Sequence, residues 1–273
     1  MPKPITYLTS SPSGDLISFL SGIRQIWLDS GRKGIIFNRL NTIGGSYEGA
    51  EQPYEDEFKN PILFNQYTFD MVRPLLLSQD YIEDYIVFTG QDYEIDFDKL
   101  RLSHFTNQPK GSLNRWASYV FPQMNANLAE VWVNVPRGAL YKDKIILNFT
   151  LRNRNHFINY FFLKKHEEKL IFAGLKNEYE IFCKEWGLDI PLLVVKDFYE
   201  LATILNGCKF VLGNQSFVMQ LCEAMKVPRI MEAFPMMPTH VVVGEWAKDF
   251  YHQTDVEYTF NKFLNKDNEK QIS

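Results

Sequence analysis

Apolar positions change their spacing several times within the first 40 residues. Residues 5–9 form a short run of β-branched, aromatic and aliphatic side chains, and a polar turn follows at 10–15. Apolar side chains then recur at helical spacing over 16–29, and Gly31 is a typical residue to end that helix. Residues 34–37 are apolar again and predict the next strand. Strand, turn, helix and strand in this order are typical of the start of a parallel α/β sheet.

Weaker periodicity follows in the rest of the first half. The pattern predicts a loop over 41–60, a helix over 67–79 with Pro74 at a bend or in its first turn, a strand at 85–88, a helix over 112–130 and a strand at 131–135. The segment 91–98 alternates acidic with apolar side chains, so one face of a strand would carry Asp92, Glu94, Asp96 and Asp98. A solvated sheet edge is the favoured interpretation, and a metal site is the alternative.

A turn-rich stretch over 136–143 precedes a second run of strands and helices. This run is predicted to contain strands at 144–148, 169–174, 192–195, 210–213 and 229–231, and helices at 177–186, after Asp197 and at 216–226. Asp197 with Glu200 three residues later has the pattern of a capping box. The tail after Tyr258 is polar and is predicted to fray at its end.

Two runs of this kind predict two α/β lobes with parallel sheets, over 1–140 and 141–273. The 273 residues, of which 45% are hydrophobic, are enough for one large core or two small ones. The net charge of −4 gives no sequence-wide basic field for nucleic acid or an anionic membrane. No run of about 18 apolar residues occurs, so we expect no membrane span. Three cysteines without a Cys-x-x-Cys pair and the lack of a signal-peptide pattern indicate a reducing, cytoplasmic location.

The main candidate for a binding site is the turn formed by Gly213, Asn214, Gln215 and Ser216, between a buried strand and a helix. Ligands bind at the carboxyl ends of strands in open α/β sheets, and a helix amino end there suits a diphosphate. Gly213 would allow close backbone approach, and Ser216 would cap the helix or donate to a phosphate oxygen. The alternative is an ordinary glycine turn with a Ser or Asn cap.

Glu223 lies two turns into the same predicted helix, on the face that also carries Ser216 and Gln220. Its carboxylate would accept both hydroxyls of a ribose whose phosphates lie at the start of the helix. The alternative is a solvated surface glutamate.

A second candidate site follows the strand at 144–148, where Thr150, Arg152, Arg154 and Asn155 form a polar loop. Two guanidiniums and a hydroxyl at the end of a strand are suited to clamp a diphosphate. The loop would face the same cleft as residues 213–216, because both segments follow strands of one sheet. A basic surface loop is the alternative.

A third candidate is Asp15, which follows Ser13 and Gly14 after the first strand. A carboxylate at the edge of the amino-terminal lobe would act as general base toward an acceptor hydroxyl, with Ser13 and Gly14 as the acceptor-side loop. Helix capping by Asp15 is the alternative. The histidines are scattered, and we assign no metal ligand.

The motif at residues 213–228, with the sequence GNQSFVMQLCEAMKVP, resembles GNDSGPMHLAAALGVP of the ADP-heptose:lipopolysaccharide heptosyltransferases, without a gap. The segments 197–202 and 208–212 are also similar to that family. Gly14 and Asp15 resemble the family's Gly-Asp loop, whose Asp is the proposed catalytic base, and the loop at 150–154 looks like its donor-phosphate loop.

The resemblance implies a GT-B fold, in which two Rossmann-like lobes with parallel sheets enclose a cleft. It makes 1–140 the acceptor-side lobe and 141–273 the lobe that binds the nucleotide-sugar. Three positions depart from the family motif, namely Gln215 for Asp, Phe217 for Gly and Gln220 for His. Glu223 resembles the Glu of the wider GT-B pattern that binds the donor ribose. The chain is therefore similar to a divergent relative of these enzymes.

The function that follows is transfer of a sugar from a nucleotide-diphosphate sugar to an acceptor hydroxyl, without a metal ion or other cofactor. Positive groups of the protein would stabilise the leaving diphosphate. The expected partners are the sugar donor and a glycan or other hydroxyl acceptor; nucleic acid is expected only as a modified-base acceptor. The alternatives are a non-catalytic nucleotide-sugar-binding module and a sugar-nucleotide epimerase or hydrolase of the same fold.

Overall fold

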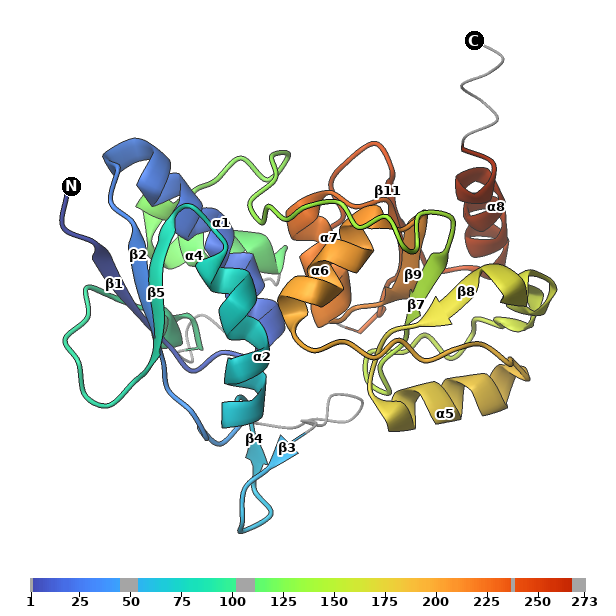
Figure 1. The fold of residues 1–273 in the computed structure, drawn as a ribbon, viewed down its shortest axis with the longest axis horizontal. Coiled ribbons are helices and arrows are strands. Elements are labelled where there is room, and N and C mark those ends of the chain that lie inside the picture. Colours follow the sequence, from blue (N-terminus) through green and yellow to red (C-terminus); the bar gives the residue numbers. More distant parts are fainter. Residues whose placement is uncertain (1, 45–53, 102–110, 237–238, 267–273) are drawn as a thin grey trace.

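Two parallel sheets, one in each half of the chain, form the framework of the protein (Figure 1). The computed structural model describes residues 2–44, 54–101, 111–236 and 239–266. Within these ranges the amino-terminal lobe has strand order β5-β2-β1-β6 and the carboxyl-terminal lobe has order β11-β10-β9-β7-β8. Every pairing within these two sheets is parallel, as the alternation of strands and helices predicted.

The elements of the amino-terminal lobe follow the predicted pattern at its start. Its strands are β1 (Ile5–Thr9), β2 (Gly34–Asn38), β5 (Ile82–Val87) and β6 (Ile95–Asp96), with a small antiparallel ribbon of β3 (Tyr54–Glu55) and β4 (Pro61–Ile62). Its helices are α1 (Ser13–Ser30), α2 (Gln66–Leu77) and α4 (Leu113–Val120), with 3₁₀ turns η1 (Phe97–Arg101) and η2 (Pro122–Met124). Helix α1 ends at Gly31, which has the left-handed φ of 70° that favours glycine.

The carboxyl-terminal lobe also matches the predicted order over most of its length. Its strands are β7 (Ile145–Asn148), β8 (Leu170–Phe172), β9 (Phe210–Asn214), β10 (Arg229–Glu232) and β11 (Ala247–Phe250). Its helices are η3 (Phe161–Lys169), α5 (Lys176–Trp186), α6 (Phe198–Gly207), α7 (Phe217–Met225) and α8 (Gln253–Leu264). No helix in the described ranges combines the length and apolar character that crossing a membrane requires.

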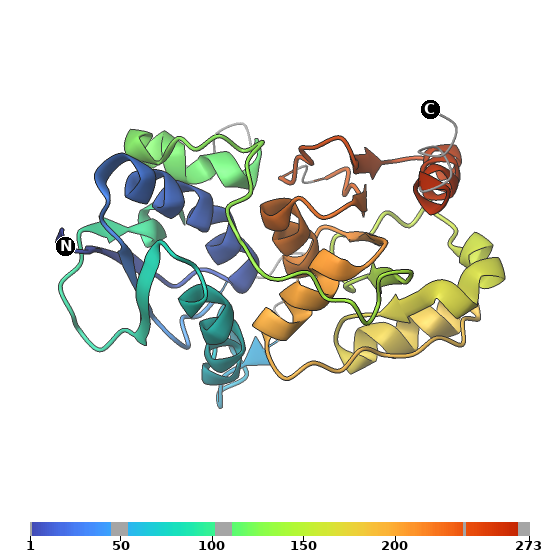
Figure 2. The same cartoon turned by 45° about the horizontal axis from the view of Figure 1, so that its top comes forward.

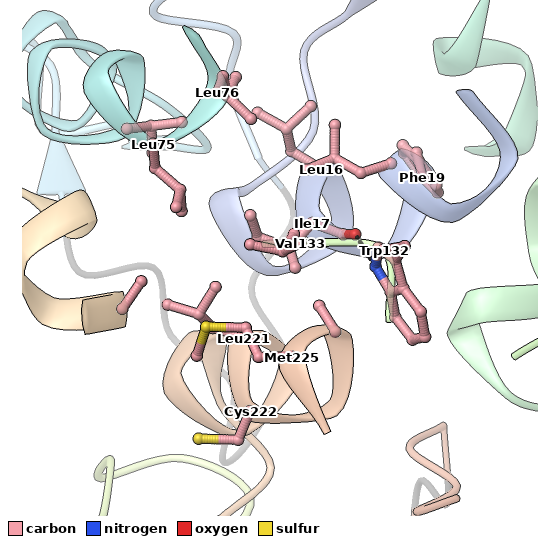
Figure 3. Packing of buried hydrophobic residues seen from close by; sticks show 14 of the residues in the cluster. Leu16, Ile17, Phe19, Leu75, Leu76, Trp132, Val133, Leu221, Cys222 and Met225 are labelled. Atoms are coloured by element: carbon pink, nitrogen blue, oxygen red, sulfur yellow. Dashed lines mark hydrogen bonds between the residues drawn. The ribbon is translucent and has the colours of Figure 1, made fainter. Parts of the chain in front are cut away.

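The lobes meet helix to helix rather than sheet to sheet. Helix α1 packs on α7, and α2 packs on α6, in the centre of the molecule (Figures 1 and 2). One apolar cluster runs through both lobes, because side chains such as Leu16 of α1 and Leu221 of α7 are buried in it together (Figure 3). The segment that joins the lobes also passes through this layer, where Trp132 donates its ring N–H to the Ile17 carbonyl at 3.0 Å. The predicted boundary at residue 140 lies in this joining segment, between η2 and β7.

Two predicted strands are not strands in the structure. Residues 131–135 join the lobes outside either sheet, and the main-chain N–H groups of Trp132 and Val133 donate to the Ala224 carbonyl near the end of α7. Residues 192–195 form a single parallel bridge, between Leu192 and Phe172, and no ladder. Both runs are apolar, and parts of them are buried in the interlobe layer or half-buried at the lobe surface. Hydrophobic periodicity alone does not distinguish such a segment from a buried strand.

Several boundaries also differ from the prediction. The predicted helix over 112–130 ends at Val120, because Pro122 stops it and starts η2. Pro74 lies inside α2 near its carboxyl end rather than in the first turn. The polar tail after Tyr258 continues α8 as far as Leu264, and the end of the tail, where fraying is predicted, falls on 267–273, outside the described residues. Part of the predicted loop over 41–60 falls on 45–53, outside the described residues.

The acidic run over 91–98 contains β6, an edge strand of its sheet. The Glu94 carboxylate pairs with Arg32 at 2.9 Å, and the Asp98 carboxylate pairs with Arg39 at 3.0 Å. Asp98 also accepts hydrogen bonds from the N–H and hydroxyl of Ser10, at 2.7 and 2.8 Å. The carboxylates of Glu94 and Asp98 are therefore paired with basic and polar groups of the same lobe. The prediction of a solvated edge did not include these pairs.

Candidate functional site

A cavity of about 680 Å³ lies between the lobes, at the carboxyl ends of both parallel sheets. Its carboxyl-lobe wall consists of the ends of β7 and β8, the segment 192–195, and the first residues of α5, α6 and α7. Its amino-lobe wall consists of Pro12 and Ser13 before and at the start of α1, Tyr54 and Leu63 near the β3–β4 ribbon, and the first two turns of α2. This is where an open parallel sheet places its ligand.

The amino ends of α1, α2, α5, α6 and α7 all border this cavity. Helix amino ends carry partial positive charge and main-chain N–H groups that lack partners within the helix. Several helices directed at one cavity therefore add their fields there, and the field favours an anionic ligand.

Asn214 joins the end of β9 to the loop that follows β7. The side chain is fully buried, and its Oδ1 accepts the Thr150 N–H at 2.9 Å. Its Nδ2 donates to the main-chain oxygens of residues 150, 152 and 153, at 3.2, 2.6 and 3.3 Å. The two predicted phosphate-binding segments are therefore adjacent, as expected for loops that follow neighbouring strands of one sheet. Asn214 contributes to this arrangement with its side chain, which positions the loop.

Arg152 borders the cavity from this loop and is partly exposed. Among the described residues, no carboxylate oxygen lies within 4.0 Å of its guanidinium. Glu178, on the first turn of α5, borders the same cavity and accepts the Leu175 N–H at 2.9 Å. Burial raises the pKa of Glu178, and the Leu175 hydrogen bond and the nearby Arg152 charge act in the opposite direction. Arg152 is thus a cation that remains available to a ligand phosphate.

Ser216 and Asn148 form a buried pair at the back of the cavity. The Ser216 hydroxyl donates to Asn148 Oδ1 at 2.6 Å and accepts the Met219 N–H at 3.2 Å, so it caps α7. Asn148 Nδ2 donates to the Ala173 carbonyl, which connects the ends of β7, β8 and β9. The Ser216 hydroxyl proton is therefore used within the protein, and the main-chain N–H groups of the first turn of α7 are what this turn offers to a ligand.

Gly213 has a structural reason to be glycine. A Cβ at this position would lie 2.1 Å from the Asn148 carbonyl oxygen on the neighbouring strand. The close approach that Gly213 permits is therefore between β9 and β7. Gly213 itself is not among the residues that line the cavity.

Arg154 and Asn155 lie behind the cavity wall rather than on it. The Arg154 guanidinium is 3.5 Å from the Glu232 carboxylate and lies over the Phe149 ring, with 5.2 Å between its carbon and the ring centroid. Asn155 donates its main-chain N–H to the same carboxylate at 2.6 Å. The predicted clamp of two guanidiniums is thus reduced to Arg152, because Arg154 neutralises a buried glutamate instead. Burial raises the pKa of Glu232, with Arg154 acting in the opposite direction.

Glu223 does not face the cavity. It is buried on α7, and its carboxylate pairs with Lys226 and Arg229 and also accepts the Val243 N–H. Both carboxylate oxygens of Glu223 therefore bind groups within the carboxyl-terminal lobe. The expectation that Glu223 binds a donor ribose is corrected by this geometry.

Gln215 is buried beside the loop that contains His240. Its Oε1 accepts the Phe234 N–H at 3.2 Å, and its Nε2 lies 3.4 Å from His240 Nδ1. Burial and the Arg152 charge lower the pKa of His240 to about 4, so the ring is neutral near pH 7. Gln215 therefore fixes main-chain segments next to the cavity, and it does not border the cavity itself.

Asp15 lies on the first turn of α1, two residues after Ser13; Ser13 borders the cavity, and Gly14 and Asp15 are not among its lining residues. Gly14 faces the start of α7, because a Cβ built there would lie 3.7 Å from Phe217 Cα. The Ser13–Asp15 segment and the 214–217 segment thus belong to two helices whose first turns abut across the lobe boundary. An acid on this turn also interacts favourably with the α1 dipole.

Four residues that border the cavity were not predicted from the sequence. Asn148 is the polar last residue of a buried strand, and Glu178 lies four positions after Gly174, the glycine that ends the predicted strand at 169–174. These two could have been found from their place after a predicted strand. Tyr54 and Tyr67 are contributed by the amino-terminal lobe, and nothing in their local pattern separates them from ordinary surface aromatics.

Solved structures with the same arrangement cover nearly the whole chain. ADP-heptose LPS heptosyltransferase II of E. coli matches with a TM-score of 0.58 and 11% identity, over 97% of this chain and 99% of its own. E. coli heptosyltransferase WaaC with ADP-2-deoxy-2-fluoro heptose matches with a TM-score of 0.61 and 12% identity, over 96% and 99%. A family 9 glycosyl transferase of Veillonella parvula matches with a TM-score of 0.53 and 12% identity, over 97% and 89%.

The chain has a GT-B fold. At 11–12% identity the likeness establishes the fold, with its two Rossmann-like lobes. No protein-family model matches the chain. A search of curated protein sequences likewise finds no match. The GT-B fold places the cavity described above at the boundary of its two lobes, so the geometry of that cavity carries the functional argument.

Proposed function

We propose that the protein is a glycosyltransferase that moves a sugar from a nucleotide-diphosphate sugar to an acceptor hydroxyl. The observation that carries the proposal is that Arg152 and the first turn of α7 border one interlobe cavity, at the carboxyl ends of both sheets. A free guanidinium and a helix amino end together suit a diphosphate. The GT-B fold supports the proposal, since the solved structures that share it are transferases of this kind.

In this proposal the diphosphate lies between the Arg152 guanidinium and the first-turn N–H groups of α7. Thr150 borders this position, and its hydroxyl donates to the Arg152 carbonyl at 3.0 Å. The apolar segment 192–195 and Phe198 border the same wall and would contact the nucleoside. The E. coli protein WaaC was solved with ADP-2-deoxy-2-fluoro heptose, so ADP-sugars are the first donors to test. Thr150, Arg152 and Ser216 border the cavity, and of these three side chains Arg152 is the proposed ligand of the diphosphate. Ser216 caps α7, and Asn214 and Gln215 support the site from behind.

Asp15 is the proposed general base. The acceptor oxygen attacks the anomeric carbon of the donor, Asp15 takes the hydroxyl proton, and the bond to the diphosphate breaks with its electron pair on the leaving oxygen. The developing charge on the diphosphate is stabilised by Arg152 and the α7 dipole. We propose that this suffices without a metal ion, and that the reaction takes place in the cytoplasm with no other cofactor.

A non-catalytic nucleotide-sugar-binding module is the second candidate. Gln220 stands where the resembling family has His, and its amide donates to the buried Asn114 of the other lobe. Gln215 stands in place of an Asp and is likewise directed at neighbouring protein groups. Both glutamines bond to other groups of the protein. A protein that binds the donor without transferring its sugar would tolerate these two replacements.

Donor turnover separates these candidates. A thermal-shift screen with ADP-, GDP-, UDP- and CDP-sugars first identifies the donor, because a ligand of the native state raises the melting temperature. Release of nucleoside diphosphate from that donor is then measured in EDTA, with methyl glycosides and sugar acids supplied as acceptors, for wild type, Asp15→Asn and Arg152→Gln. If the protein is a transferase, wild type releases nucleoside diphosphate. Asp15→Asn then lowers the rate of release at least about 100-fold and still binds the donor. Binding without any release by wild type would instead establish the binding module.

A further inference from the structure

The amino-terminal wall of the cavity differs in chemistry from the wall that faces it. Its members, as far as the structure describes the chain, are Pro12, Ser13, Tyr54, Leu63, Tyr67, Thr68 and Met71. None of these carries a formal charge at pH 7. Of the charged side chains that border the described cavity, Arg152 and Glu178 both belong to the opposite lobe.

Two tyrosines give this wall its shape. Tyr67 and Met71 are four residues apart on α2 and therefore share one helix face. Tyr67 is 62% exposed, and within the described chain no aromatic ring stacks on it. Tyr54 borders the same wall from the β3–β4 ribbon.

The start of α2 holds this face in place. Asn65 accepts hydrogen bonds from the Thr68 N–H at 2.8 Å and from the Thr68 hydroxyl at 2.9 Å. Asn65 thereby caps α2, Thr68 is buried, and the ring of Tyr67 beside it is exposed. The exposed ring of Tyr67 is therefore carried by a rigid first turn rather than by a loop.

Charge decides what such a wall accepts. A carboxylate or phosphate on the acceptor would need a basic partner, because an unpaired anion loses its hydration without compensation. The described part of this wall offers none, and the donor diphosphate proposed on the opposite wall would repel a second anion. An uncharged sugar ring instead presents C–H groups to an aromatic face and hydroxyls to Ser13 and the tyrosine hydroxyls.

We propose that this wall is the acceptor subsite and that it takes an uncharged sugar ring, stacked on Tyr67 and bordered by Tyr54 and Met71. The proposal rests on the proposed sugar transfer and names the chemical class of its acceptor. It assigns Tyr67 as a residue that determines specificity, with the apolar C–H face of the sugar as the feature that is recognised.

Saturation-transfer difference NMR tests this without turnover. The probes are methyl glycosides of glucose, galactose and mannose as uncharged sugars, and glucuronic acid and glucose 6-phosphate as anionic ones, each with ADP present. We expect ring-proton signals from at least one uncharged glycoside, with affinity reduced at least about fivefold by Tyr67→Ala and retained by Tyr67→Phe. Tyr258→Ala on α8 removes another exposed tyrosine, 71% exposed, and serves as the matched control.

The outcomes separate this proposal from the one on which it rests. ADP binding is measured by calorimetry on the same samples. If ADP binds but only the anionic sugars give signals, or if Tyr67→Ala leaves glycoside affinity unchanged, the uncharged-acceptor proposal is overturned and the donor site stands. If none of ADP, GDP, UDP and CDP binds and no glycoside binds, the proposed function itself fails, and this inference fails with it.

Discussion

Asn214 is the residue whose removal tests the architecture of the site most sharply. Its fully buried amide makes one hydrogen bond to the Thr150 N–H and three to main-chain oxygens of the loop at 150–153. Asn214→Ala removes all of these at once and leaves a buried N–H and several carbonyls without their partner. At about 0.5–1.5 kcal/mol for each net hydrogen bond, with the longer ones counted least, we expect a loss of about 2–4 kcal/mol in the free energy of unfolding.

Asn214→Asp is the informative second variant. It keeps the acceptor for Thr150 but replaces the donating amide with an oxygen that faces three carbonyl oxygens. Burial and these oxygens raise the pKa of the introduced acid above its unfolded value, so the folded state favours the protonated form. The variant is therefore closest to wild type below about pH 4 and loses stability as the pH rises toward 7.

Urea denaturation followed by tryptophan fluorescence measures both variants, and calorimetry measures ADP binding. The loop that carries Arg152 should loosen, so ADP affinity should fall about tenfold or more with Asn214→Ala. Asn261→Asp, on the exposed side of α8, is the matched control and should change stability by less than about 0.5 kcal/mol. A loss below about 0.5 kcal/mol in Asn214→Ala, with unchanged ADP affinity, would refute the role assigned to this side chain.

Three further predictions follow from buried contacts. Gly213→Ala should cost about 3 kcal/mol or more, or prevent folding, because its Cβ would lie 2.1 Å from a carbonyl oxygen of β7; Gly14→Ala meets nothing closer than 3.7 Å and should be neutral or slightly stabilising in the same denaturation series, and equal losses would contradict this. Arg154→Met should cost about 3–5 kcal/mol by leaving the Glu232 carboxylate buried without its cation, and Arg154→Met with Glu232→Gln should recover at least half; no recovery in the double variant would contradict the pairing. The lowered pKa of His240, about 4, means that the unfolded chain takes up a proton between about pH 6.5 and 4 that the folded chain does not. The unfolding free energy should therefore fall by at most about 3 kcal/mol over that range, and His240→Gln should flatten the profile; an unchanged slope would show that the ring is not held neutral.

The sequence was sufficient to predict the elements whose apolar positions follow one period and end at clear signals. Helix α1 ends at Gly31 as predicted, and Asp197 caps α6 by accepting the Glu200 N–H at 2.8 Å. The other half of that predicted capping box is wrong, because the Glu200 side chain accepts the Lys196 N–H instead. The sequence predicted that the loops after β7 and β9 face one cleft because both follow strands of one parallel sheet, and the structure adds that these two strands are neighbours.

The errors on α7 have one physical cause. The helical wheel predicted an apolar stripe and a separate polar face that would carry Gln220 and Glu223. In the structure both side chains are buried, because α7 is enclosed by α1, α6 and its own sheet. Polar residues on such a helix must find partners inside the protein, and Gln220 pairs with Asn114 while Glu223 pairs with Arg229. The polar pattern of one helix does not reveal that the other lobe covers its polar face.

The same limit applies to the cavity. Arg152 and Arg154 are two positions apart in a loop, so the sequence predicted the same role, binding a diphosphate, for both guanidiniums. The structure separates them, because the Glu232 carboxylate at the end of β10 takes Arg154 into the lobe and leaves Arg152 at the cavity. Tyr67 reaches the cavity only because α2 packs against α6 of the other lobe.

The central claim is that the interlobe cavity holds a nucleoside diphosphate between Arg152 and the first turn of α7. Difference electron density from crystals grown with ADP, or with the nucleotide that the thermal-shift screen selects, tests this directly. The account predicts two phosphates within hydrogen-bond distance of the Arg152 guanidinium and the main-chain N–H groups at the start of α7. Density for the diphosphate at any other place on the protein, with this cavity containing only water, would contradict it.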